Sequence, residues 1–91
     1  MINNFYKTKT VYKVLELINA ERESLKSDLV AYSSDPVRFL RRFRMLINLA
    51  EYELNILNKI QQFESIDPKD FDHTTLNLVK QEIKNIVNRN A

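Results

Sequence analysis

Four arginines cluster near the middle of the chain and alternate with the apolar residues Phe39, Leu40 and Phe43; they are Arg38, Arg41, Arg42 and Arg44. Guanidinium groups bind phosphate and other anions, so one interpretation is a patch for nucleic acid or for an anionic partner. The other is a solvated face whose cations pair with acids of the preceding helix, with Asp28 roughly opposite Arg41. The formal net charge of +2 is small for a nucleic-acid reader, which favours the second interpretation.

Arg22 is the second charged group of interest, because it falls in the middle of an apolar helical stripe. An unpaired buried charge costs several kcal/mol, so this side chain needs an acid or must extend its charged end into solvent. Glu53 is the best candidate partner. The two residues differ by about 9 Å in axial level within an antiparallel hairpin, which is long for a pair within one chain. The ion pair could instead form between two chains. We interpret Arg22 and Glu53 as a polar layer that sets the register of packing.

Few other residues have the types and spacing that chemistry requires. The single histidine, His73, falls in a polar segment beside Asp70 and Asp72 without a recognisable metal-ligand spacing. The chain has no cysteine and no glycine, which excludes thiolate chemistry, disulfides and glycine-rich phosphate loops. We therefore expect no catalytic residues, no metal, no cofactor and no enzymatic activity.

Two Asp-Pro pairs, Asp35-Pro36 and Asp67-Pro68, divide the 91 residues. Asp is a good helix N-cap and Pro suits the first helical position, so each pair ends one helix and begins the next. The pattern predicts one all-α domain over residues 1–91: an antiparallel helical hairpin plus a shorter third helix. The predicted parts are an N-terminal arm at 1–8 and helices at 10–32, 36–64 and 74–88.

Each long helix shows a stripe with heptad spacing. The first stripe consists of Val11, Leu15, Ile18, Arg22, Leu25, Leu29 and Tyr32. The second consists of Leu40, Phe43, Ile47, Ala50, Leu54 and Leu57, and we expect it to face the first helix. Further apolar residues widen the second helix to an apolar arc of roughly 200°, about twice what one neighbour covers. They are candidate interface residues for a dimer or a dedicated partner: Phe39, Leu46, Ile56, Ile60 and Phe63.

One resemblance to a known family concerns the segment 17–25, LINAERESL, and the tripeptide Pro36-Val37-Arg38. These resemble the first helix and the second segment of small all-helical chorismate mutases. The resemblance implies an intertwined dimer with arginines and a lysine around the substrate carboxylates. Arg22 is the one such position that can be assigned here, so this enzyme class is a remote alternative.

The expected function is that of a non-enzymatic protein–protein interaction module, such as a small helical regulator, inhibitor or chaperone that covers a partner with an apolar helical face. A homodimer or a dedicated protein partner would complete the bundle. A nucleic-acid-associated protein acting through the arginine cluster is the main alternative. The longest uncharged apolar run near the middle is too short for a membrane span, and the first residues have no apolar core of signal-peptide length, so we expect a cytoplasmic protein.

Overall fold

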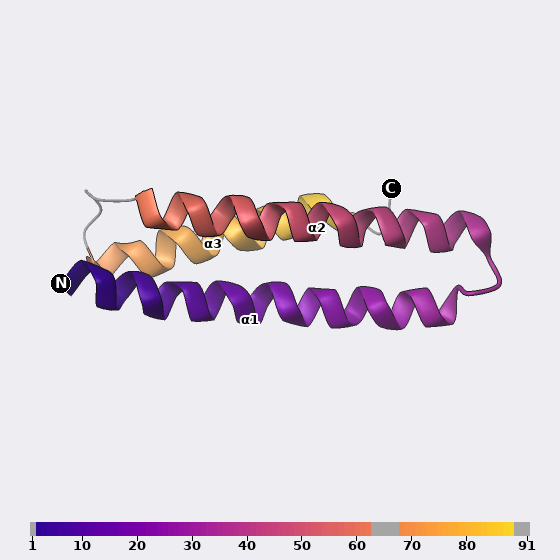
Figure 1. Cartoon of the computed structure of the whole chain (residues 1–91), viewed down its shortest axis with the longest axis horizontal. Helices are drawn as coiled ribbons and strands as arrows, with labels where there is room; N and C mark the ends of the chain where they lie inside the picture. Colours follow the sequence, from indigo (N-terminus) through magenta and orange to yellow (C-terminus); the bar gives the residue numbers. More distant parts are fainter. Residues whose placement is uncertain (1, 63–67, 89–91) are drawn as a thin grey trace.

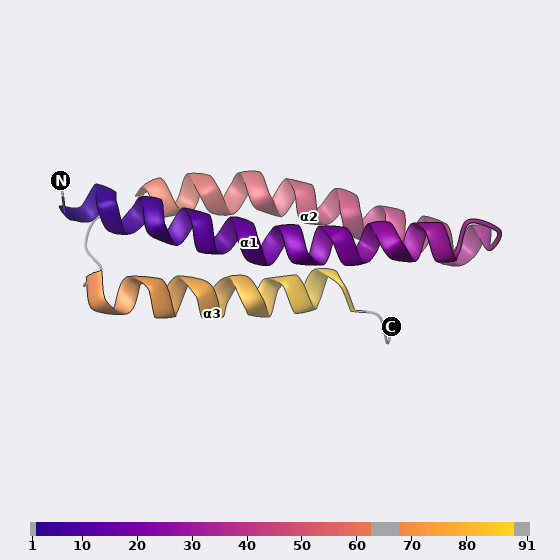
Figure 2. The same cartoon turned by 90° about the horizontal axis from the view of Figure 1, so that it is seen from below.

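The computed structural model describes residues 2–62 and 68–88, with the side chains of residues 9–60 and 73–88. Within them the chain forms three helices and no strand: α1 (Ile2–Ala31), α2 (Pro36–Gln62) and α3 (Pro68–Ile86). α1 and α2 form an antiparallel hairpin, and α3 lies along one side of it, parallel to α1 (Figures 1 and 2). The predicted all-α fold, a long hairpin with a shorter third helix, is confirmed.

The turn of the hairpin lies where the first Asp-Pro pair predicts it. α1 ends at Ala31 and α2 begins at Pro36. The Asp35 side chain accepts a hydrogen bond from the backbone N–H of Arg38 at 3.2 Å, while its carbonyl accepts the first intrahelical bond, from Phe39, at 2.9 Å. Asp35 is therefore the N-cap of α2 and Pro36 its first helical residue.

Two predicted boundaries are wrong. Residues 2–8, expected to be an arm, form the first turns of α1, because they contain no Gly or Pro and the missing heptad stripe says nothing about helical propensity. α3 begins at Pro68 instead of residue 74, so His73 is helical, since Pro favours the first helical turn. The last two residues predicted for the second helix, 63 and 64, lie outside the described part of the chain.

The molecule is a rod of 51 × 19 × 16 Å with a radius of gyration of 15.2 Å. A compact chain of this length would have a radius near 12 Å. The 27 residues of α2 and the 30 of α1 account for this elongation, because at 1.5 Å per residue each is longer than a sphere of this mass is wide.

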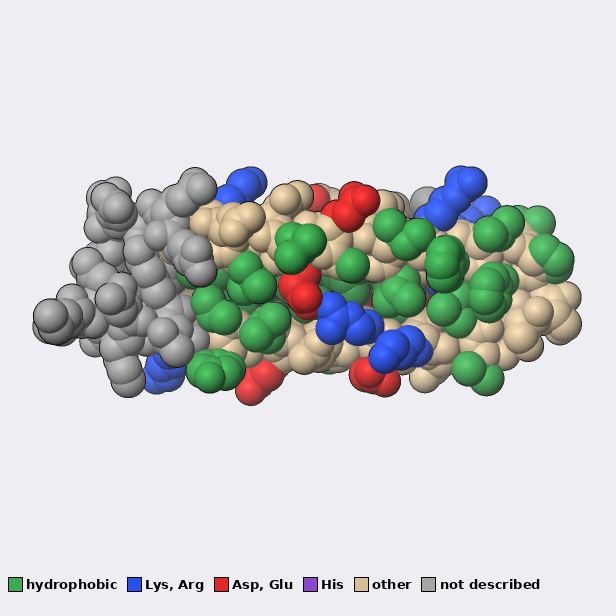
Figure 3. Space-filling view, in the orientation of Figure 1, with side chains coloured by type: hydrophobic (Ala, Val, Ile, Leu, Met, Phe, Trp, Pro, Cys, Tyr) green, Lys and Arg blue, Asp and Glu red, His purple; other side chains and the backbone are tan. Residues whose placement is uncertain are grey.

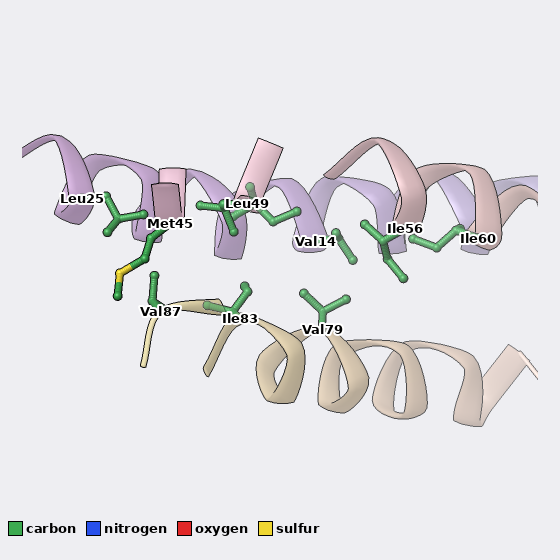
Figure 4. Close-up of a cluster of buried hydrophobic side chains, with 10 residues drawn as sticks. Val14, Leu25, Met45, Leu49, Ile56, Ile60, Val79, Ile83 and Val87 are labelled. Carbon is green, nitrogen blue, oxygen red and sulfur yellow. The ribbon is translucent and has the colours of Figure 1, made fainter. Parts of the chain in front are cut away.

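The core runs along the line where the three helices meet. α1 contributes Val14, Ile18 and Leu25, α3 contributes Val79 and Ile83, and Val87 follows directly after α3. Figure 4 shows the side chains of Val79, Ile83 and Val87 pointing toward the hairpin. α2 completes the core with Met45, Leu49, Ile56 and Ile60.

One buried polar atom in the core has no partner. The hydroxyl of Thr75 is buried and makes no hydrogen bond within the described structure. Because an unsatisfied buried hydroxyl costs about 1–3 kcal/mol, Thr75→Val should stabilise the protein by about 1 kcal/mol and raise Tm by about 4–8 °C. Thermal unfolding followed by circular dichroism measures this. The control is Thr74→Val at the exposed neighbouring position, which should leave Tm nearly unchanged. A lower Tm for Thr75→Val would show that the hydroxyl has a partner.

Candidate partner-binding surface

Helix α2 carries apolar residues on two different sides. The first side, here called the inner stripe, faces the core and consists of Arg42, Met45, Leu49, Ile56 and Ile60. The second, the outer stripe, is the heptad series predicted from the sequence: Leu40, Phe43, Ile47, Ala50, Leu54 and Leu57. The two stripes are centred roughly 140° apart around the helix at 3.6 residues per turn. α2 therefore has an apolar side that neither α1 nor α3 covers.

The outer stripe is open to solvent along most of its length. Its large residues are exposed by 54% (Leu40), 42% (Phe43), 44% (Ile47) and 67% (Leu54), and Ala50 is exposed as well. Leu57, at the end of the stripe, is half-buried. This corrects the prediction that the series faces the first helix. The reason is that the inner stripe contains a charged residue and a methionine, which makes it look less apolar in the sequence than it is in its packing.

The predicted interface residues divide into three groups. Ile56 and Ile60 are buried in the core, with 5% and 0% exposure, so they are not available to a partner. Phe39 and Leu46 are half-buried at the edge of the outer stripe, and Leu46 also packs against the core. Phe63 lies outside the described residues. Only the edge residues thus remain as candidates.

The hairpin face that looks away from α3 is shown in Figure 3. Hydrophobic side chains gather over α2 and along the line between α2 and α1, and charged groups interrupt them near the middle. At the turn end, the rings of Phe39 and Phe43 stack with centroids 6.4 Å apart. This face thus carries apolar groups over α2, with aromatic rings at the turn end and charged groups near the middle.

The four arginines do not form one patch. Arg42 is turned inward: its side chain is 11% exposed and its Nε lies 3.2 Å from Oδ2 of Asp28. The N–H of this Nε is not aligned for a hydrogen bond, so the contact is an ion pair. Arg42 thus pairs with Asp28, the acid that the hairpin register places near Arg41, because a one-residue step turns the side chain by about 100° and puts Arg42 on the core side.

The remaining arginines of the cluster lie on the surface. Arg38 pairs with Asp35 at 3.5 Å and lies over the ring of Tyr32, which Arg42 contacts as well. Arg41 has an interaction within the chain, and Arg44 is exposed. Tyr32 is the member of this group that the sequence interpretation missed as a cation-binding ring, although it ends the predicted stripe of the first helix.

The predicted pairing of Arg22 with Glu53 occurs within one chain. Nη2 of Arg22 lies 2.5 Å from Oε2 of Glu53, and Nη1 lies 2.5 Å from Oδ1 of Asn19. Side chains of a helix tilt toward its N-terminus. In an antiparallel hairpin this tilt brings the two side chains toward each other, which spans the difference in axial level. The charge of Arg22 is thus balanced, and the pair forms a polar layer between α1 and α2.

An open hollow between α2 and α3 contains Tyr52, a residue whose pKa is shifted. It is lined by Asn48, Glu51, Tyr52, Asn55, Glu82, Asn85 and Ile86. Burial, and secondarily the charge of Glu82, raise the pKa of Tyr52 to about 12. The phenol therefore stays protonated at neutral pH and cannot serve as a base there.

The described side chains contain no group of three or more His, Cys, Asp or Glu residues that could hold a metal ion. Nε2 of His73, exposed on α3, lies 3.2 Å from Nδ2 of Asn77. Asp70 and Asp72 lie outside the described side chains.

Comparison with known proteins gives no relative: no family model, curated protein or solved structure matches the chain. None of the described helices is long and apolar enough to cross a membrane.

Proposed function

We propose that this protein is a non-enzymatic interaction module that binds a protein partner through the outer stripe of α2. The observation that carries the proposal is the exposure of four large apolar side chains at heptad spacing on one helix: Leu40, Phe43, Ile47 and Leu54. Heptad spacing is the pattern by which one helix packs along another, so the stripe suits a helical partner.

The energetics favour occupation of this surface. Fully burying one leucine or phenylalanine side chain stabilises a complex by about 1.5–3 kcal/mol. Each of the four side chains has about half of its surface still exposed, so each would contribute a part of that amount. Exposed apolar patches on a monomer often mark a site at which a partner binds.

The geometry gives no specific support to the two alternatives. A nucleic-acid site would need the arginines on one face, but Arg42 is buried against Asp28 and Arg38 is paired with Asp35. A substrate-binding arginine would need an unpaired guanidinium, whereas Arg22 is held by Glu53 and Asn19. The interaction module is therefore the function that the surface supports best.

Site-specific photocrosslinking in the native host tests the proposal. A photoreactive amino acid at Leu54 should give a discrete higher-mass adduct on irradiation. The matched control is the same substitution at Leu78, an apolar residue of α3 with similar exposure (56% against 67%) that lies off the outer stripe. The proposal predicts an adduct at Leu54 and none at Leu78. No adduct at Leu54, or equal adducts at both positions, would contradict it.

A further inference from the structure

Resting on the proposed function, we infer that the partner of the outer stripe is a second copy of this chain, whose α2 packs antiparallel against the first. The two copies are related by a two-fold axis that passes near Asn48 and Leu49, the midpoint of the stripe. Both the order of the apolar residues and the charges at the edge of the stripe point to this arrangement.

The spacing of the outer stripe is the same in both directions along the helix. Its intervals are 3, 4, 3, 4 and 3 residues. In an antiparallel pair, Leu40 then lies opposite Leu57 of the second copy, Phe43 opposite Leu54, and Ile47 opposite Ala50. The large and small residues of the central layers are thereby matched, so that the side chains of one copy fill the space left by the other.

The charged residues beside the outer stripe favour an antiparallel over a parallel arrangement of the two α2 helices. Arg44 and Glu51 lie seven residues apart on the same edge, and both are exposed. Within the described structure neither belongs to an ion pair or has another polar contact. In the antiparallel register, Arg44 differs from Glu51 of the second copy by two residues in axial level, about 3 Å. The two-fold axis makes a second such pair, so the dimer gains two ion pairs.

A parallel pair lacks this match. There the residues on one edge of the stripe meet those on the opposite edge of the other copy. Arg44 would face Phe39, and Glu51 would face Leu46. Glu53, on that opposite edge, would face Asn58 and is already bound to Arg22. No pair of opposite charges forms, and two charges are placed against apolar groups.

The dimer should be weak. The stripe runs over 18 residues, about 26 Å, and is one helix wide. A strip of this length and width buries less area than the roughly 800 Å² per partner that a stable interface buries. We therefore expect dissociation in the micromolar range, and the assembly should be measured over a wide concentration range.

Charge exchange tests the inference. Sedimentation equilibrium of the full chain from low to high micromolar concentration should show a monomer–dimer equilibrium. Arg44→Glu and Glu51→Arg should each weaken dimerisation by about tenfold, because each turns both ion pairs into like-charge pairs. The double variant Arg44→Glu/Glu51→Arg should restore the original affinity. Circular dichroism checks that the fold is retained. A monomer at all concentrations, or a double variant no tighter than the single ones, would overturn the inference.

Disulfide trapping tests the direction, since the natural chain has no cysteine. The double variant Leu40→Cys/Leu57→Cys should form a covalent dimer on oxidation, whereas Leu57→Cys alone should not. A parallel pair would link Leu57→Cys alone and would overturn the inference.

The photocrosslinking experiment separates the two proposals. An adduct at Leu54 with twice the mass of the chain supports the second copy. An adduct with a different protein, together with a monomeric chain in sedimentation, overturns the second copy while the interaction module stands. No adduct overturns both.

Discussion

Leu49→Ala should lower the free energy of unfolding by about 2–5 kcal/mol, while Leu54→Ala on the same helix should change it by less than about 1 kcal/mol. Leu49 is fully buried in the core, whereas 67% of Leu54 is exposed. Removing the Leu49 side chain therefore leaves a cavity among the three helices, and removing that of Leu54 leaves none. Since small domains have only about 5–15 kcal/mol of stability, the first change takes a large part of the total.

Urea unfolding at low protein concentration measures this difference, because any self-association is then minimal. The comparison is internally matched: both changes delete the same atoms from α2, five residues apart. Equal losses for the two variants would contradict the assignment of inner and outer stripes. So would a larger loss for Leu54→Ala, which is the order that the heptad pattern alone predicts.

Asp28→Asn should destabilise the protein by about 1–3 kcal/mol. The guanidinium of Arg42 is nearly enclosed, and Asp28 is the acid that balances its charge at 3.2 Å. Breaking a fully buried pair by removing one partner costs about 3–5 kcal/mol; here the expected loss is smaller because the Asp28 side chain is 27% exposed. Asparagine keeps the shape and removes the charge.

The control for this effect is Glu23→Gln, which removes the acid of the Lys26–Glu23 pair. That pair spans a similar distance, 3.3 Å, but its side chains are exposed by 56% and 72%, so the change should cost less than about 0.5 kcal/mol. A second variant, Asp28→Asn/Arg42→Met, should recover most of the loss, since it replaces the ion pair by apolar packing. Equal effects of Asp28→Asn and Glu23→Gln in denaturant unfolding would show that the Asp28–Arg42 pair contributes no more than a surface pair.

The architecture could be predicted because its signals are local. The Asp35-Pro36 pair fixes the turn through a capping hydrogen bond that needs only four residues. The absence of glycine and the regular apolar spacing define the two long helices. The Arg22–Glu53 pair could be predicted because both charges lie next to apolar stripes and have no other strong candidate partner.

Which side of α2 packs against the core could not be predicted, because the apolar arc of this helix is wide enough to hold two stripes. The spacing of apolar residues in the sequence indicates that a helix has an apolar side, but it does not indicate which neighbouring helix covers that side. The position of α3 decides this: it packs on the side of Met45 and Leu49 and leaves Leu40 and Leu54 open. The assignment of Asp28 to Arg42 required the same information, since adjacent arginines differ by about 100° in direction.

The short third helix has a consequence for how the hairpin opens. α3 ends beside Leu25 and Met45, so the turn end of the hairpin extends beyond it as two helices without a third (Figures 2 and 4). Fewer apolar contacts hold this end, so its backbone amides should open by local fraying at a lower free energy than those of the three-helix part. Leu40 and Phe43 lie in this weaker end. Binding there would suppress this expected fraying, so affinity for the partner and the cooperativity of unfolding should be linked through the turn end of the hairpin.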